Sequence, residues 1–338
     1  MFAVGRTLGR AVASAAVAVG LALPSAGHAE TLKLAHFVPP FHVVTKAVVD
    51  PLVNGVKKDS GGELDIKVYP GGELGKGPVE QYVRAINGVA DITWGLHGYT
   101  SSQFPKSMIV EMPGVVEEAG SGYEAIWRAY DGHLKNEYPG TIPLALWASE
   151  PMVLMMRDKI VRKPSDLAGL KIRVSGSVPA KVIEALGATP VQMPAPGMYN
   201  ALQTNLIDGI LTGSSVLRDF KIKEVANVVV EGPLFGRVLF YLVMNEGKYK
   251  GLSGKAKAAI DANSGAGLSK SGEVGWQGSA DAAMASMHAD SSKKVIKLSA
   301  AESKAFNDIT LKVRAKMIAD MDAKGIPASK VLAKMTGK

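Results

Sequence analysis

The chain after residue 30 alternates between strand-like and helix-like hydrophobic patterns. Apolar and polar residues alternate over Thr31–His36 and again over Leu64–Tyr69, which predicts two strands. Between them, His42–Asp59 carries apolar residues at helical spacing and ends at Gly61 and Gly62. This strand–helix–strand order predicts a mostly parallel sheet with helices on its faces.

The same alternation continues to the C-terminus. Further predicted elements are a helix over Pro78–Asn87, strands over Val89–Trp94, Val238–Asn245 and Lys294–Leu298, and surface helices over Ala300–Lys324 and Ser329–Met335. A long helical pattern over Ser253–Asp290 contains five glycines, at 265, 267, 272, 275 and 278. Each glycine costs roughly 1 kcal/mol inside a helix, which argues against one straight helix here.

Two segments share one plan, a helix end followed by a turn and a strand. They are Ala85–Ile92 and Ala201–Ile210, and their similarity suggests two related units. The strands end in Trp94–His97 and Leu211–Ser214. Ligands of open α/β sheets bind beyond the carboxyl ends of the strands, so a cleft is expected where these two ends face each other.

One charged residue interrupts a short apolar strand pattern at Lys171–Val174. A buried strand tolerates Arg173 only when a partner compensates its charge, and the planar guanidinium suits a carboxylate. Arg173 is therefore a candidate anchor for an anionic ligand. The alternative is a structural arginine paired with an acid of the protein itself.

The pattern around Arg173 resembles the solute-binding subunits of tripartite ATP-independent periplasmic (TRAP) transporters. The resemblance rests on Asp166–Val174 (DLAGLKIRV), Ala185–Pro190 (ALGATP), Tyr199–Gln203 and Asp208-Gly209, in the family's order. It implies that Arg173 clamps a ligand carboxylate. It also implies a periplasmic binding protein-like α/β fold, in which two lobes are joined by crossing strands and a long helix. The expected boundaries are 30–150 plus 238–278 for lobe I and 151–237 plus 279–338 for lobe II.

The function implied by the resemblance is capture of an organic acid and its delivery to the TRAP membrane subunits. Other classes that fit are an exported enzyme acting on a carboxylate substrate, the binding protein of an ATP-driven importer, and a ligand-presenting sensor subunit. The sequence contains no G-x-S-x-G or H-E-x-x-H motif, so a non-enzymatic role is expected. Nothing in the sequence requires a dimer, and a monomer is expected.

Two departures from the family pattern make the predicted pocket less polar. Many members carry a second arginine about 20 residues before the first, where this chain has Ser149–Val153 with Met152 in the segment; Arg157 lies at a different spacing. Thr212 occupies the position of a ligand-binding asparagine. The expected ligand is a monocarboxylate with an apolar or aromatic body.

Aromatic and histidine residues of the two strand ends complete the predicted site. The candidates are His36, Trp94, His97, Tyr199 and Phe240, each of which has a core-packing role as its alternative. Strand alternation sends only one of Phe240 and Tyr241 toward the cleft. His36 and His42 have no acidic residue close by in the sequence, so neither a metal nor another cofactor is expected.

The first 29 residues are predicted to be a cleaved signal peptide. Arg6 and Arg10 precede an apolar stretch over residues 11–23, and small residues at Gly27 and Ala29 predict cleavage after Ala29 and a periplasmic protein. The chain has no cysteine, so no disulfide framework is expected. Its net charge of +8 is spread out without aromatic interleaving, which excludes a nucleic-acid patch.

Overall fold

The computed structural model describes residues 1–3, 5 and 30–338 of the chain. The predicted signal peptide and its cleavage after Ala29 therefore lie outside the described residues. The strands of the first sheet are β1 (Glu30–Ala35), β2 (Leu64–Tyr69), β3 (Ile92–Leu96), β4 (Thr141–Ala148) and β10 (Leu239–Asn245). The strands of the second sheet are β5 (Met152–Met156), β6 (Lys171–Val174), β7 (Thr189–Gln192), β8 (Gly209–Gly213), β9 (Val228–Glu231) and β11 (Lys294–Lys297).

Each sheet is mostly parallel, with one strand that runs against its neighbours. The strand order is β2-β1-β3-β10-β4 in the first sheet and β11-β9-β5-β8-β6-β7 in the second. β10 pairs antiparallel with β3 and β4, and β5 pairs antiparallel with β8 and β9. We call the first sheet with the helices packed on it lobe I, and the second sheet with its helices lobe II. The predicted α/β fold is confirmed.

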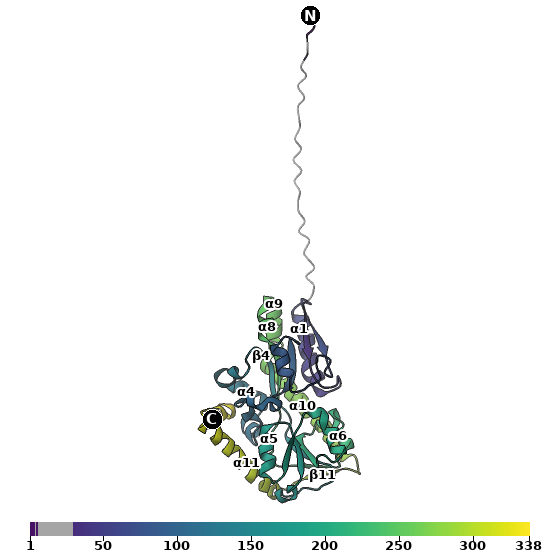
Figure 1. Ribbon diagram of the computed structural model, residues 1–338, viewed down its shortest axis with the longest axis vertical. Helices are drawn as coiled ribbons and strands as arrows, with labels where there is room; N and C mark the ends of the chain where they lie inside the picture. Colours follow the sequence, from purple (N-terminus) through teal and green to yellow (C-terminus); the bar gives the residue numbers. More distant parts are fainter. Residues whose placement is uncertain (4, 6–29) are drawn as a thin grey trace.

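The chain passes between the sheets at several points. It leaves β4 for β5 through residues 149–151 and returns from β9 to β10 through residues 232–238. The two antiparallel strands are thus the ones that follow a crossing. Helix α10 (Gly265–His288) packs against β4 of lobe I and against α7 and β11 of lobe II, and Figure 1 shows it between the two ends of the molecule.

In lobe I the helices include α1 (Asp50–Asp59), α2 (Gln81–Ile86), α3 (Val115–Ala119), α4 (Gly122–Ala129), α8 (Glu246–Gly251) and α9 (Gly254–Ala262). In lobe II they include α5 (Ser177–Ala185), α6 (Met198–Gln203) and α7 (Val216–Asp219). At the C-terminus they are α11 (Ala300–Ala323) and α12 (Ala328–Thr336). Helices α1, α2, α11 and α12 lie within the ranges predicted from the sequence or differ from them by one residue, and several further helices were not predicted.

The first predicted helix is divided by a wider π turn over Thr45–Val49. Here the N–H of Asp50 bonds to the carbonyl of Thr45, five residues back. Pro51 has no N–H to donate to a carbonyl four residues before it, and the chain adopts the i→i+5 pattern just ahead of it. The buried face still comes from the predicted apolar residues, among them Val48, Leu52 and Val56.

As the glycine content indicated, Ser253–Asp290 is not one helix: α9 ends at Ala262, and α10 begins at Gly265, whose φ of +73° is left-handed. The other four glycines lie within α10 without interrupting it. Two of them allow close packing. A methyl group at Gly272 would lie 2.9 Å from the Trp147 ring, and one at Gly275 would lie 2.3 Å from the Cβ of Ala47. The packing that glycine permits offsets its propensity cost.

The last helix, α12, lies against lobe I, although α11 before it lies against lobe II. α12 packs against α3 and α4 of lobe I, whereas α11 packs against α5 of lobe II. The lobe boundaries drawn from the sequence stay a prediction. Within residues 1–3, 5 and 30–338, the helices are all too short or too polar to span a lipid bilayer.

Candidate ligand-binding site

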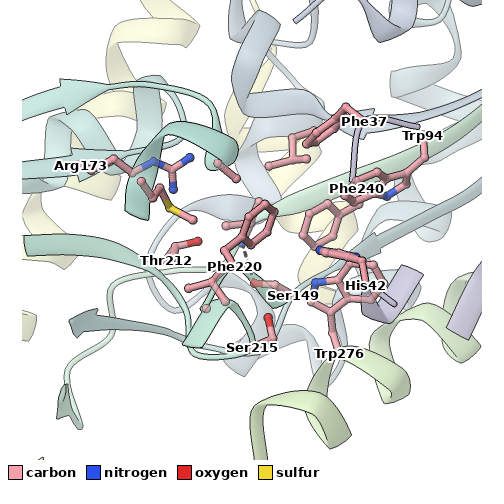
Figure 2. A pocket seen from close by; sticks show the side chains of 16 residues that line it. Phe37, His42, Trp94, Ser149, Arg173, Thr212, Ser215, Phe220, Phe240 and Trp276 are labelled. Atoms are coloured by element: carbon pink, nitrogen blue, oxygen red, sulfur yellow. Dashed lines mark hydrogen bonds between the residues drawn. The ribbon is translucent and has the colours of Figure 1, made fainter. Parts of the chain in front are cut away.

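A cavity lies between the two sheets, at the carboxyl ends of β3, β6 and β8. Its free volume is about 40 Å³. Figure 2 shows Arg173 on one side of it and the aromatic side chains of Phe37, Trp94 and Phe240 on another. Both lobes contribute walls, as the two strand-end segments in the sequence predicted.

Arg173 is the charged group of the cavity wall. It is only 1% exposed, and its Nε and Nη2 atoms donate to the carbonyl of Met193 at 2.9 and 2.8 Å. No Asp or Glu oxygen of the described residues lies within 4.0 Å of it, so the internal acid of the alternative interpretation is not found there. Burial lowers the pKa of Arg173, and the neighbouring Tyr99 hydroxyl opposes this shift.

One edge of the guanidinium is bonded to the protein backbone. The carbonyl of Met193 accepts from Nε and Nη2, and the Tyr99 hydroxyl is a further polar neighbour, so the remaining N–H groups have no carboxylate partner among the described residues. That remaining edge has the fork geometry that a carboxylate accepts in a bidentate pair. A buried cation of this kind favours binding of an anion.

The opposite side of the cavity is a stack of aromatic rings. Phe37 stacks on Trp94 with ring centres 5.1 Å apart, and Trp94 stacks on Phe240 at 5.7 Å. Trp276 from α10 approaches Phe240 at 4.8 Å. Of the two candidates on β10, Phe240 lines the cavity, whereas Tyr241 packs against Tyr82 on the other face of the sheet.

The structure brings four of the predicted site residues together. Arg173, Thr212, Trp94 and Phe240 all line the cavity, and Thr212 lies beside Arg173 in Figure 2.

Four other predicted residues do not line this cavity. His97 turns away because η2, a 3-10 helix over His97–Gln103, begins at this residue; its Nε2 lies 2.7 Å from the Tyr138 hydroxyl. Burial lowers the pKa of His97 to about 3, so its ring is neutral. Tyr199 donates to Glu224 at the surface (2.9 Å), and Met152 packs in the core at the start of β5.

His36 is also buried away from the cavity wall. Neither of its ring nitrogens has a hydrogen-bond partner among the described residues, and burial lowers its pKa to about 4. Arg157 is held at the surface by Asp158, Asn205 and the carbonyl of Gln203. The described residues contain no cluster of three or more acidic or histidine side chains that could hold a metal ion.

Sequence reasoning missed several residues that line the cavity. They are His42, Ser149, Ser215, Phe220 and Trp276, with smaller apolar residues such as Ala195, Met198 and Val216. Trp276 could have been suspected, because it is the one tryptophan of the bridging helix. The position of Phe220, just after α7, depends on how the two lobes meet and leaves no signal in the sequence.

Direct contacts between the lobes close the cavity. The N–H of Ala195 in lobe II donates to the Tyr99 hydroxyl of lobe I at 2.8 Å. A methyl group at Gly176 would lie 2.5 Å from the carbonyl oxygen of Gly98. The backbones of the two lobes therefore touch at the segments that follow β3 and β6.

Known proteins of similar sequence and structure are solute-binding proteins. A TRAP solute-binding protein from Rhodoferax ferrireducens, in complex with copurified benzoate, is 30% identical with a TM-score of 0.83, over 91% of this chain and 97% of that one. One from an unidentified marine microbe, specific for aromatic acid ligands, is 27% identical with a TM-score of 0.82 over 91% and 97%. A further relative, the outer membrane transporter protein TsaT of Comamonas testosteroni, is 27% identical over 76% of each chain.

The family model for bacterial extracellular solute-binding proteins, family 7, matches residues 34–320. This confirms the resemblance that the residues around Arg173 indicated. The chain therefore belongs to family 7 of the bacterial extracellular solute-binding proteins, the solute-binding proteins of TRAP transporters.

Proposed function

We propose that this protein captures an aromatic monocarboxylate in the periplasm and delivers it to TRAP membrane subunits. The observation that carries the proposal is a buried Arg173, without an acidic partner in the described residues, that faces a wall of aromatic rings. The benzoate and aromatic-acid complexes of the two similar solved structures support the same ligand class.

The charges of the cavity favour a single carboxylate. Arg173 is the one lining residue with a permanent positive charge, since the segment where many relatives carry a second arginine holds Ser149 and Met152. A second carboxylate would be buried without a cation, which is strongly unfavourable. Aromatic rings instead supply a surface for an apolar body.

Capture is proposed to occur by closure of the two lobes around the acid. Arg173 and Thr212 of lobe II would hold the carboxylate, while Phe37, Trp94 and Phe240 of lobe I cover the ring. The protein is proposed to be exported by a signal peptide cleaved after Ala29, to act as a monomer, and to release its ligand unchanged.

A ligand screen tests this function. Purified mature protein is melted with benzoate, phenylacetate, mandelate, succinate and glucuronate, and the hits are measured by calorimetry. We expect aromatic monocarboxylates to raise the melting temperature, because a hundredfold excess over Kd stabilises by about 2.7 kcal/mol. Stabilisation only by succinate or glucuronate would contradict the proposal, and chemical conversion of the bound acid, seen by chromatography, would favour an enzyme.

Closure itself is tested at the contact between the lobes. Gly176 has extended backbone angles that any residue can adopt, so only the approach of Gly98 requires a glycine there. Gly176→Ala should strain the closed form by roughly 1–3 kcal/mol and weaken benzoate binding about 5- to 150-fold. The melting temperature without ligand should change little, because the strain is relieved when the lobes open.

Gly267→Ala is the matched control, since nothing lies within 4 Å of the added methyl group. It should bind benzoate as the wild type does. Unchanged affinity in Gly176→Ala would show that the closed contact between the lobes is not needed for binding.

A further inference from the structure

His42 stands on the far side of the cavity from Arg173. Figure 2 shows the two side chains on opposite sides, with Phe220 between them in this view. Three aromatic rings surround the imidazole, with centres 5.4 Å (Trp94), 5.5 Å (Phe220) and 5.7 Å (Trp276) away. His42 is thus a polar residue of the cavity wall that lies across from Arg173.

The hydrogen bonds of His42 determine its tautomer. Nδ1 accepts the N–H of Val44 at 3.1 Å, so in the neutral ring the proton must be on Nε2. The ring is neutral, because burial first, and then the nearby His36 and Arg218, lower the pKa of His42 to about 3. His42 therefore presents one N–H donor at a fixed position.

That donor has no acceptor at hydrogen-bond distance in the described residues. The nearest carboxylate oxygen, Oδ2 of Asp219, is 3.7 Å from Nε2, beyond the usual limit of about 3.2 Å. The same oxygen is approached by the N–H of Val43 at 3.4 Å. An N–H without an acceptor on a cavity wall can be satisfied by an oxygen of the ligand.

The two neighbouring serines, Ser149 and Ser215, already have hydrogen-bond partners in the protein. Ser149 Oγ donates to the carbonyl of Glu150 at 2.6 Å and accepts the N–H of Val238 at 3.0 Å. Ser215 interacts with the buried carboxyl of Glu150 through its hydroxyl and its N–H. His42 shares this side with Trp94, whose buried indole N–H also has no acceptor among the described residues.

We propose that His42 is a specificity-determining residue, whose Nε2–H donates to an oxygen substituent on the ring of the bound acid. The preferred ligand is then a hydroxylated aromatic monocarboxylate, held at one end by Arg173 and at the other by His42. This inference rests on the proposed function and names its substrate class more narrowly.

The test compares benzoate with its three monohydroxylated isomers, and phenylacetate with its own three, by calorimetry. In the wild type, one hydroxylated isomer should bind roughly 3- to 10-fold more tightly than its unsubstituted parent, as expected for one net hydrogen bond. His42→Phe keeps an aromatic ring but has no donor, so the hydroxylated acid and its parent should bind this variant with about equal affinity. The matched control His288→Phe changes an exposed histidine of α10 and should keep the preference.

A purely structural His42, paired with Asp219, would behave differently. His42→Phe would then lower the affinity for parent and hydroxylated acid by the same factor, and this outcome overturns the inference. The inference is also overturned if the wild-type protein binds benzoate through Arg173 but prefers none of the hydroxylated isomers. In both of these cases the proposed function still holds. If no aromatic acid of either series binds, the proposed function fails and this inference falls with it.

Discussion

Arg173→Ala is expected to remove nearly all affinity for benzoate while the protein stays folded. The guanidinium is buried, and its free edge is the one permanently cationic group of the cavity wall. Removing one partner of such a pair costs roughly 2–5 kcal/mol, or about a 30- to 4,000-fold loss of affinity. Calorimetry with benzoate measures this loss, and Arg173→Met, with a longer apolar side chain, should show it as well.

The fold should survive because the change removes a charge that the described part of the protein does not neutralise. Deleting an unpaired buried cation removes its desolvation cost, while the Met193 carbonyl loses its donor. Thermal melting without ligand checks this expectation. Arg157→Ala, which changes a surface arginine of the same lobe, is the control and should bind normally. Wild-type affinity in both Arg173 variants would remove this residue from the site.

The sequence predicted Arg173 because a charge in a short apolar strand is unusual and has a limited set of explanations. Thr212 followed from its place in the family pattern, and Trp94 and Phe240 from strand ends that face a cleft. His97 could not be placed in the same way. It comes one residue after β3 ends, and the 3-10 helix that begins there directs the ring toward Tyr138.

Long-range packing explains the other differences between expectation and structure. Helix propensity assigns each glycine of α10 an unfavourable free energy. It does not include tertiary packing, and here Trp147 and Ala47 occupy the space that side chains at Gly272 and Gly275 would need. The same limit applies to Trp276 and Phe220. Their positions in the cavity follow from how α10 and α7 meet lobe I, and a local pattern cannot show this.

Buried acids and buried histidines give the stability of this protein opposite dependences on pH. Burial lowers the pKa values of His36, His42 and His97 to about 4, 3 and 3, so the unfolded chain binds more protons below pH 6.5 and stability falls as the pH drops. Burial raises the pKa values of Glu111 and Glu150 to about 8 and 7. For these acids the folded state binds more protons above pH 4.5, so stability falls as the pH rises.

Glu111→Gln is expected to remove much of the loss of stability at alkaline pH. One oxygen of Glu111 accepts the N–H of Leu239 at 2.8 Å, at the start of β10, and the other has no partner among the described residues. A glutamine reproduces the protonated acid, with an acceptor for Leu239 and no charge. Between pH 6.5 and 8 the histidines no longer contribute, so the wild type should lose about 1.4 kcal/mol per pH unit through Glu111.

Urea unfolding at pH 6.5, 7.5 and 8.5 measures the free energy of unfolding of both proteins. The advantage of Glu111→Gln should grow with pH and level off above about pH 8, where the folded wild type also loses the proton. The total effect relative to acid pH is roughly 4–5 kcal/mol. Glu73→Gln, which changes an exposed acid of lobe I, should keep the wild-type slope. Parallel slopes for wild type and Glu111→Gln would mean that Glu111 is already ionised in the folded protein, which would require β10 to open to water where it re-enters the first sheet.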